Sequence, residues 1–543
     1  MPSQAGAKRR IAGKRKRERV KPMAHKSLFA SFKGRFSNKT VSHNLAGGRA
    51  YEYDDRHKLA QLAVTGTIGD LHYQNAEQEL QAVLTAASKV SDDFLAKTAI
   101  YARQNGKMKD MPALLLAVLA SRDPVLLSRA FGEVVTNGKM LRNFVQIMRS
   151  GQTGRKSLGT RPKALVQAWL NSASDYQLLQ ASVGQSPSLA DVIKMVHPKP
   201  RNAEREALYR WLIGKPCAAE NLPEQVRDYV AYKEDPKGRM VPDVPFQMLT
   251  SLPLSAKDWA TIARRGSWNM VRMNLNTFLR HGAFEDEQVV ADVARIVSDE
   301  TRVRKANAFP YQLMTTYQAL SMQMPRQIRE ALHDAMEIAV SNVPAFDGKV
   351  VVCPDVSGSM TWPVTGTRGT ATTSTRFVDI AALVSAAVLR QNKSAEILPF
   401  EFDVREVSLE PRDSILTNAQ RLAELAGGGT NCSAPLAWLN KRQKAPDLVI
   451  MVSDNQSWAD QSRGGNYGTS MMGRWTTLKK RNPKAKLVCI DIAPYGTSQA
   501  KSRPDVLNIG GFSDAVFEQI AAFAEDRSSA EYVVGEIERI ELR

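Results

Sequence analysis

Hydroxyl and carboxylate side chains follow an apolar run in the second half of the chain. The run Val350 to Pro354 leads into Asp-Val-Ser-Gly-Ser, which spaces Asp355, Ser357 and Ser359 at alternate positions of one strand-to-loop corner. Three hard oxygen atoms close together suit Mg²⁺, which keeps water or an outside ligand at its other positions. The spacing predicts a site for one divalent cation, and loop capping without metal is the alternative interpretation.

Two later segments supply the same kind of side chain. The glycine-rich turn Gly427 to Asn431 precedes a helix and carries Thr430, and Val452-Ser453-Asp454 ends a second apolar run with a carboxylate. Ligands of open α/β sheets bind beyond the carboxyl ends of the strands, where such segments meet. We therefore expect Thr430 and Asp454 to join the three earlier residues at one edge of a sheet.

The elements needed to position these residues are expected in residues 346–543. Short apolar runs predict strands, and amphipathic stretches between them predict helices. The strands are expected at Lys349 to Cys353, Ile397 to Phe402, Asp447 to Val452 and Lys486 to Ile492, and the helices at Phe377 to Arg390, Asp413 to Leu425, Ser433 to Arg442 and Ser513 to Ala524. Alternation of this kind indicates a Rossmann-like, mostly parallel sheet covered on both faces.

A different pattern fills residues 27–345. Ser27 to Asp55 has no sustained periodicity and is expected to be a linker, whereas Tyr73 to Ser341 reads as one amphipathic helix after another, for example Gln78 to Ser88, Asp92 to Gln104 and Pro112 to Ser121. The rhythm fits HEAT-like helical pairs of roughly 40 to 47 residues. This predicts a helical solenoid, with a compact helical bundle as the alternative.

Composition and charge narrow the class of protein. The 543 residues are 43% hydrophobic and carry a net charge of +19, so we expect a folded protein with a polyanionic partner. Ten basic residues face the single acid Glu18 in residues 1–26, which predicts a disordered basic tail, either merely solvated or in contact with phosphates. No apolar stretch is long enough to span a membrane, and the four scattered cysteines indicate reduced thiols in the cytoplasm.

The second domain resembles a von Willebrand factor A domain with a metal-ion-dependent adhesion site. The resemblance covers roughly 195 residues and implies Mg²⁺ with an open position for an acidic ligand group. The metal-binding residues that it implies are Asp355, Ser357, Ser359, Thr430 and Asp454. Thr361 to Thr375 is an insertion beside this site, and its Arg368 and the adjoining Arg376 either meet phosphate or belong to an exposed loop.

The helical part is similar to the TROVE module of the Ro autoantigen family and its bacterial or phage relatives. The similar segments are Tyr101-Ala102-Arg103-Gln104 with Met108-Lys109-Asp110, Asp191 to Pro200, and Asn307 to Gln312. Their order ahead of an A domain that carries Asp-Val-Ser-Gly-Ser-Met matches the Ro arrangement. The resemblance implies a monomeric ring of HEAT-like repeats closed by the A domain, single-stranded RNA 3′ ends in its hole, and small Y-like RNAs on its outer surface. It further suggests an exoribonuclease partner such as a polynucleotide phosphorylase.

Candidate RNA-binding residues lie in two regions. His197, Lys199 and Arg201 correspond to the Y RNA-binding region of the family, although His197 before a proline also suits a helix end. Arg272 lies in a basic stretch near Trp268 and Phe278, which fits single-strand binding, although helical spacing equally places the two aromatic residues in a core.

Catalysis is not expected from this sequence. We find no nucleophile with a base, no carboxylate pair for acid and base catalysis, and no phosphate-binding loop. A lone Mg²⁺ held mainly by hydroxyls lacks the second metal or general base of many nucleases. The sequence therefore predicts a non-catalytic RNA-binding protein of RNA quality control. The alternatives are a Mg²⁺-dependent protein-interaction scaffold without RNA and a metal-dependent phosphoesterase.

Overall fold

The computed structural model divides the chain into two units, Met1–Phe36 and Ser37–Arg543. It describes residues 41–184, 186–306, 310–340, 343–366, 375–459, 468–511, 515–525 and 532–543. The basic tail predicted at 1–26, residues 307–309 of one TROVE-like segment and Arg368 therefore lie outside the described residues. Within the described residues, none of the helices is long and apolar enough to cross a membrane.

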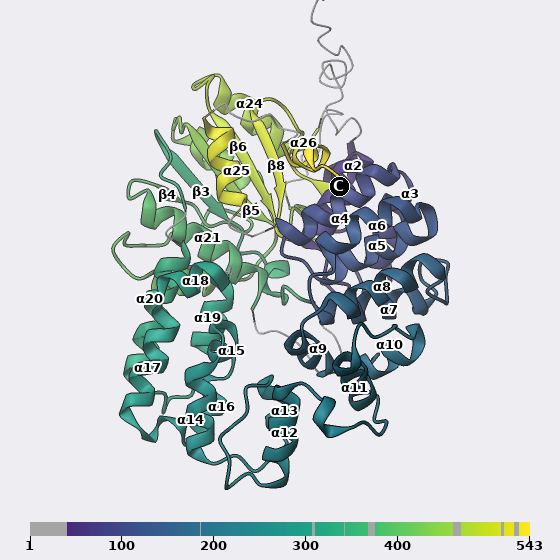
Figure 1. Cartoon of the computed structure of the whole chain (residues 1–543). Helices are drawn as coiled ribbons and strands as arrows, with labels where there is room; N and C mark the ends of the chain where they lie inside the picture. The colour runs from purple at the N-terminus through teal and green to yellow at the C-terminus, as the bar shows by residue number, and fades with distance from the viewer. Residues whose placement is uncertain are drawn as a thin grey trace, which may run out of the picture. The chain divides into compact units, whose positions relative to one another are not determined.

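The first part of the second unit is helical from Asp55 to Val340 (Figure 1). Its α-helices up to residue 212 are α2 (Asp55–Thr65), α3 (Ala76–Ser88), α4 (Asp92–Gln104), α5 (Asp110–Arg122), α6 (Pro124–Val134), α7 (Gly138–Ser150), α8 (Thr160–Ser172), α9 (Asp175–Ser182), α10 (Leu189–Val196) and α11 (Ala203–Leu212). They are followed by α12 (Glu224–Glu234), α13 (Phe246–Leu249), α14 (Ala256–Arg265), α15 (Trp268–Met273), α16 (Leu275–Arg280), α17 (Glu287–Ser298), α18 (Glu300–Ala306), α19 (Pro310–Gln318) and α20 (Arg326–Val340). Short 3₁₀ turns lie at η1 (Ala219–Asn221) and η2 (Ala283–Glu285).

Helix starts in this part have local causes. The Ser91 side chain accepts from the Phe94 amide and starts α4, and Asp123 caps α6, where Pro124 occupies the first turn. Apolar faces then pack in an overlapping series, α4 on α5 and α6, α5 on α7, and α6 on α8. Contacts of each helix with its next and second-next neighbours are those of a stacked solenoid of helical pairs.

The C-terminal part is an α/β domain (Figure 1). Its parallel sheet has the strand order β4-β3-β5-β6-β8, with β3 (Val350–Pro354), β4 (Glu396–Ile397), β5 (Leu448–Ser453), β6 (Lys486–Asp491) and β8 (Val506–Gly510). Around it lie η3 (Gly358–Thr361), α21 (Phe377–Gln391), α22 (Ile415–Ala423), α23 (Ala434–Lys441), α24 (Ser470–Lys479), α25 (Ala515–Ala524) and α26 (Tyr532–Arg539).

Strand alternation divides the apolar side chains between two layers. Val350 and Val352 of β3 belong to the large core with α21 and α22, whereas Val351 and Cys353 belong to a second core with Trp475 of α24. Both faces of the sheet are thus buried, as expected for a parallel sheet. The register pairs Val352 with Ile450 and Pro354 with Val452, so β3 and β5 end side by side.

The structure corrects some sequence-based expectations. The strand expected at Ile397 to Phe402 is limited to β4, with Phe400 making only two isolated bridges, and β8 was not predicted. The linker expected at Ser27 to Asp55 contains β1 (Val41–His43) and β2 (Arg49–Glu52), which pair with each other and, through β2, with β7 (Thr497–Ser498). Such short strands carry little alternation, and the partner of β2 lies more than 400 residues away.

Both ends of the helical part contact the α/β domain. At the N-terminal end, Gln519 of α25 donates to the Tyr101 hydroxyl at 2.9 Å. At the C-terminal end, Glu337 of α20 pairs with Arg390 of α21 at 3.2 Å. The first and the last helices of the helical part therefore both pack against the same α/β domain.

Candidate cation site and basic cavity

The residues of the predicted cation site meet where β3 and β5 end. Asp355 directly follows β3, and its amide donates to the Val452 carbonyl at 2.9 Å. The Ser357 amide donates to Asp355 Oδ1 at 2.8 Å, and the Ser357 and Ser359 hydroxyls lie 3.4 Å apart. Burial raises the pKa of Asp454 and the Ser359 side chain opposes that shift, so these two side chains are neighbours as well. Four of the five predicted residues thus lie together.

Thr430 is brought to this group by its backbone. The Gly358 amide donates to the Gly428 carbonyl at 3.0 Å, which holds the glycine-rich turn against the loop after β3. The Thr430 carbonyl accepts from the amides of Trp458 and Ala459 at 3.0 and 3.1 Å, which ties it to the loop after β5. Gly428 has φ +78° and a Cβ there would overlap the Glu401 carboxylate, so the turn requires glycine. The Thr430 side chain is buried.

The electrostatics of the group favour a bound cation. Asp355 and Asp454 are fully buried, and burial raises the pKa of both carboxyls, with the Asp454 charge adding to the shift of Asp355. Within the described residues neither carboxylate forms an ion pair with Lys, Arg or His. Two buried carboxylates beside three hydroxyls fit a hard divalent cation, because it would offset the charge and accept the remaining oxygen lone pairs.

Two further residues at the candidate cation site were not found from the sequence. Ser453, the last residue of β5, donates to Asp355 Oδ2 at 2.6 Å and fixes that carboxylate. The position of Ser453 directly before Asp454 could have indicated this role, because a hydroxyl at the end of β5 lies at the same edge of the sheet as the predicted cation site. Tyr73, in the segment between α2 and α3, interacts with the Ser359 side chain. No local pattern marks Tyr73, which lies almost 300 residues earlier.

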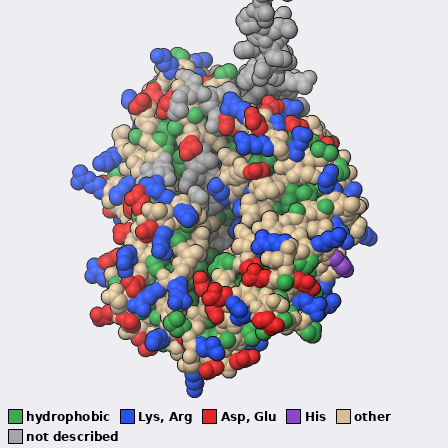
Figure 2. All heavy atoms as spheres, viewed as in Figure 1, with side chains coloured by type: hydrophobic (Ala, Val, Ile, Leu, Met, Phe, Trp, Pro, Cys, Tyr) green, Lys and Arg blue, Asp and Glu red, His purple; other side chains and the backbone are tan. Residues whose placement is uncertain are grey.

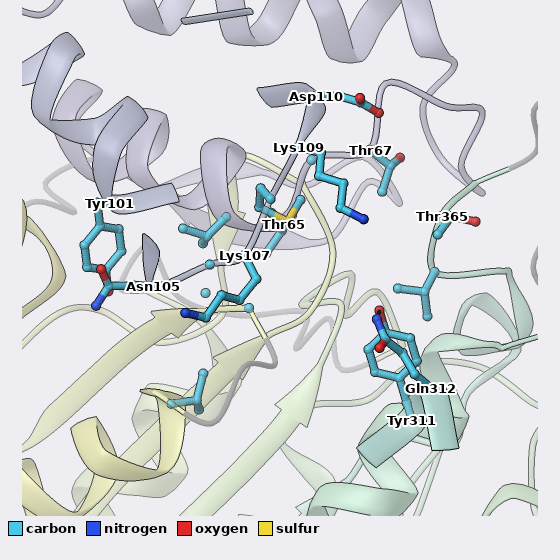
Figure 3. Close-up of a pocket in the computed structure, with 18 of the residues that line it drawn as sticks. Thr65, Thr67, Tyr101, Asn105, Lys107, Lys109, Asp110, Tyr311, Gln312 and Thr365 are labelled. Atoms are coloured by element: carbon cyan, nitrogen blue, oxygen red, sulfur yellow. Dashed lines mark hydrogen bonds between the residues drawn. The ribbon is translucent and has the colours of Figure 1, made fainter. Parts of the chain in front are cut away.

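A second feature is a basic cavity of about 1050 Å³. Its walls include Arg103 of α4, Lys107 and Lys109 of the segment before α5, and Arg272 of α15, together with polar side chains of α19. A smaller cavity of about 420 Å³ adjoins it and shares Lys107, Lys109, Tyr311, Gln312 and Thr365 (Figure 3). Figure 3 shows the two lysines on one side of this cavity and Tyr311 with Gln312 on the other.

The cavity holds positive charge with little compensation. Burial, then the charges of Lys139 and Arg103, lower the pKa of Lys109. Neither Lys107 nor Lys109 has an ion-pair partner among the described residues. One acid, Glu133, lines the larger cavity, and its carboxylate accepts from Gln104 at 2.7 Å. An anion is therefore the complementary ligand.

Arg272 is a wall residue of this cavity rather than a surface side chain. It is 7% exposed, and its guanidinium lies 5.5 Å over the Trp268 ring and donates to the Gln312 carbonyl at 3.0 Å. Its Nε is buried without a hydrogen-bond partner. Trp268 and Phe278 are buried in the core. For these two aromatic residues the core interpretation is therefore correct, and the interpretation as stacking surfaces for single-stranded RNA is not.

The predicted outer-surface residues lie elsewhere. His197 ends α10 with φ 52°, and His197, Lys199 and Arg201 are all exposed in the segment before α11. A left-handed residue before a proline is a helix end, so His197 has that structural role and is also available on the surface. Figure 2 shows that Lys and Arg on the visible face are mixed with Asp and Glu, around a hollow near its centre. The four cysteines are free thiols, as expected.

Comparison with known proteins gives consistent results. Residues 349–524 match the family model described as the Ro60 vWA domain. The chain is 24% identical over 517 residues to the RNA-binding protein RO60 of Deinococcus radiodurans, covering 89% of this chain and 94% of that protein. It is also 24% identical over 251 residues to RNA-binding protein RO60 of Caenorhabditis elegans, covering 42% of this chain and 36% of that protein.

The fold is also similar to that of the Deinococcus protein. The crystal structure of the Deinococcus radiodurans RO (RSR) protein superposes with a TM-score of 0.58 at 18% sequence identity, covering 88% of this chain and all of that one. The helical part and the α/β domain therefore share their architecture with that protein. The predicted combination of a helical solenoid and a C-terminal A domain is confirmed.

Proposed function

We propose that this chain, which is similar over most of its length to the RO60 protein of Deinococcus radiodurans, is a non-catalytic RNA-binding protein of the Ro type that acts in RNA quality control. The basic cavity carries this proposal, since it brings Arg103, Lys107, Lys109 and Arg272 to one space of about 1050 Å³. The relatives named RNA-binding protein RO60 support it independently.

The cavity suits the single-stranded 3′ end of a structured or misfolded RNA. Unpaired lysines attract phosphates, and each phosphate neutralised releases counterions. Tyr311 and Gln312 add an aromatic face and an amide, the groups that stack on and hydrogen bond unpaired bases. Access through the helical part, closed by the A domain as a ring, would select RNAs whose ends are single-stranded.

The exposed group His197, Lys199 and Arg201 is the proposed surface for a small Y-like RNA. It is positively charged, exposed and separate from the residues that line the cavity. One surface would thus hold a structured RNA while the cavity holds an end. Such an RNA would also offer a means of tethering an exoribonuclease to a monomeric, cytoplasmic protein.

The A domain would bind one Mg²⁺ through Asp355, Ser357, Ser359, Thr430 and Asp454. The ion would offset the two buried carboxylates and join the loops that follow β3 and β5. In this proposal its contribution is to the shape and stability of the domain. No described group of three or more His, Cys, Asp and Glu suggests a further metal.

The test begins with protein purified from its native cells without nuclease, followed by sequencing of the bound RNA. A His197→Ala, Lys199→Ala, Arg201→Ala variant is expected to lose a discrete small RNA. A Lys107→Ala, Lys109→Ala variant is expected to keep that RNA and to bind a hairpin with a single-stranded 3′ tail about tenfold more weakly. Lys233→Ala, Lys237→Ala, which changes two exposed lysines, is the matched control.

Each part of the proposal has its own contrary result. Absence of enriched RNA from every protein would overturn RNA binding and favour a protein scaffold. Equal binding of the tailed hairpin by the cavity variant and the control would remove the cavity from the proposal. Shortening of the RNA that stops in Asp355→Ala would show a phosphoesterase instead.

A further inference from the structure

The candidate cation site is closed to solvent. Asp355 and Ser357 are 0% exposed, Thr430 and Asp454 are 1% exposed, and Ser359 is 5% exposed. A site that takes an acidic group from another molecule must present an accessible face. In this chain the residues that would hold the ion are instead almost entirely covered by other parts of the same molecule.

The cover includes a tyrosine of the helical part. Tyr73 lies in the segment between α2 and α3, and its phenol interacts with the Ser359 side chain and with the carboxylates of Asp454 and Asp355. The segment reaches the loop after β3, because the neighbouring His72 packs on Trp362, whose amide donates to the Ser359 carbonyl at 3.3 Å. The Ser359 side chain also interacts with the Asp454 carboxylate. The phenol oxygen therefore lies next to the predicted ligands, on a segment that belongs to neither strand β3 nor strand β5.

The position of Tyr73 is fixed by several contacts. The Leu71 amide donates to the Gln74 carbonyl at 2.7 Å, which closes a turn around it. The Tyr73 ring meets the Tyr495 ring edge-on at 5.8 Å. The neighbouring His72 ring packs edge-on against Trp362 at 5.3 Å. Two aromatic contacts and a turn therefore hold this segment in place.

We infer that Tyr73 closes the cation site from within the chain, in the place that an acidic group of a partner would otherwise take. A cation bound there would join the helical part to the A domain, because one of its neighbours comes from before α3 and the others come from loops of the A domain. This inference rests on the proposed cation site. It makes the site an internal clasp and not an adhesion surface.

The experiment uses Tb³⁺, a luminescent substitute for a hard divalent cation, with the full-length protein. Luminescence lifetimes in H₂O and D₂O give the number of water molecules on the bound ion. We expect Tyr73→Phe, which keeps the ring but removes the hydroxyl, to bind Tb³⁺ with one more water than the wild type. We also expect release into excess chelator to become about threefold to tenfold faster, as for the loss of one hydrogen-bonding ligand group.

Two further variants separate the possible failures. Tyr176→Phe changes a tyrosine that is 40% exposed on α9 and should match the wild type in both measurements. If Asp355→Ala keeps the wild-type luminescence, the cation site itself is refuted and the inference falls with it. If Asp355→Ala loses the signal while Tyr73→Phe has wild-type hydration and release, only the role of Tyr73 is refuted. A thermal unfolding curve for Tyr73→Phe confirms that the folded protein is compared.

Discussion

The Ser453 hydroxyl donates a 2.6 Å hydrogen bond to Asp355 Oδ2, so the last residue of β5 holds the carboxylate that follows β3. Asp355 also accepts from the Ser357 amide at 2.8 Å. Both of its oxygens are thus engaged before any ion binds. The orientation is set by the neighbouring strand, and a buried carboxylate beside Asp454 is left with its negative charge unpaired by Lys, Arg or His within the described residues.

Asp355→Asn should raise stability in the absence of divalent cations. The amide oxygen can still accept from the Ser357 amide and the amide nitrogen can donate to the Ser453 hydroxyl, while the repulsion between two buried carboxylates disappears, which we expect to add about 1 to 2 kcal/mol to the free energy of unfolding. With Mg²⁺ the order should reverse, because only the wild type gains stability from the ion. Urea unfolding with chelator and with Mg²⁺ measures both. A variant whose stability still rises with Mg²⁺ would place the ion elsewhere.

The sequence was sufficient where a feature depends on neighbouring residues. Ser91 and the Asn105-Gly106 turn bracket a helix that was predicted with the bounds of α4. The loops after β3 and β5 were placed at one edge because parallel strands share an edge. These features follow from capping and from strand direction, which act within a few residues or follow from topology alone.

Contacts between distant segments were beyond local reasoning. Helix α2 is buried on nearly all sides because it packs on α3 and α4 and also on β8 and α26, so it lacks the one-sided pattern that marks a surface helix. Lys107 and Lys109 look like ordinary surface charges in sequence, and their place in a cavity depends on α15 and α19. Tyr73 likewise reaches its site only through the tertiary fold.

Stability should fall in mildly acidic solution because of His57. This side chain is 4% exposed and stacks on Tyr53 at 4.4 Å, and burial, opposed by Asp54, lowers its pKa to about 4. In the unfolded chain the pKa is about 6.5. Above pH 6.5 both states are neutral and the contribution is complete, and between pH 6.5 and 4 only the unfolded state takes up the proton, so the contribution is lost as the pH falls.

The change is measured by urea unfolding at pH 7 and pH 5. We expect the wild type to lose about 2 kcal/mol through this residue between those values, and His57→Phe, which keeps the stacked ring, to lose that much less. His43→Gln, at an exposed position, is the control. An unchanged pH dependence in His57→Phe would assign the acid sensitivity to other groups.

Arg205 should be a major stabilising residue of the solenoid. It is 1% exposed, donates to the Leu170 and Ala173 carbonyls at 3.0 and 2.8 Å, and pairs with Asp175 at 3.1 Å. Arg205→Ala leaves two carbonyls at the end of α8 and one carboxylate without this partner. We expect a loss of about 3 to 5 kcal/mol in the free energy of unfolding.

The nearby exposed Arg201 provides the comparison. Arg201→Ala should change stability by no more than about 0.5 kcal/mol, because its side chain is exposed, although it is expected to weaken Y-like RNA binding. Chemical denaturation of both variants under one set of conditions tests the contrast. Similar losses of stability in the two variants would mean that the hydrogen bonds of Arg205 add no net stability, because water replaces them in the unfolded chain.

The salt dependence of RNA binding should separate the cavity from the surface. If Lys107 and Lys109 each neutralise one phosphate of a single-stranded tail, their joint replacement by alanine should reduce the slope of log affinity against log salt by about 1.4. The Lys233→Ala, Lys237→Ala control should keep the wild-type slope, because those lysines are exposed and do not line the cavity. Titrations of a tailed hairpin from low to physiological salt measure the slope directly. A weaker affinity with an unchanged slope would mean that the two lysines shape the cavity without contacting phosphate.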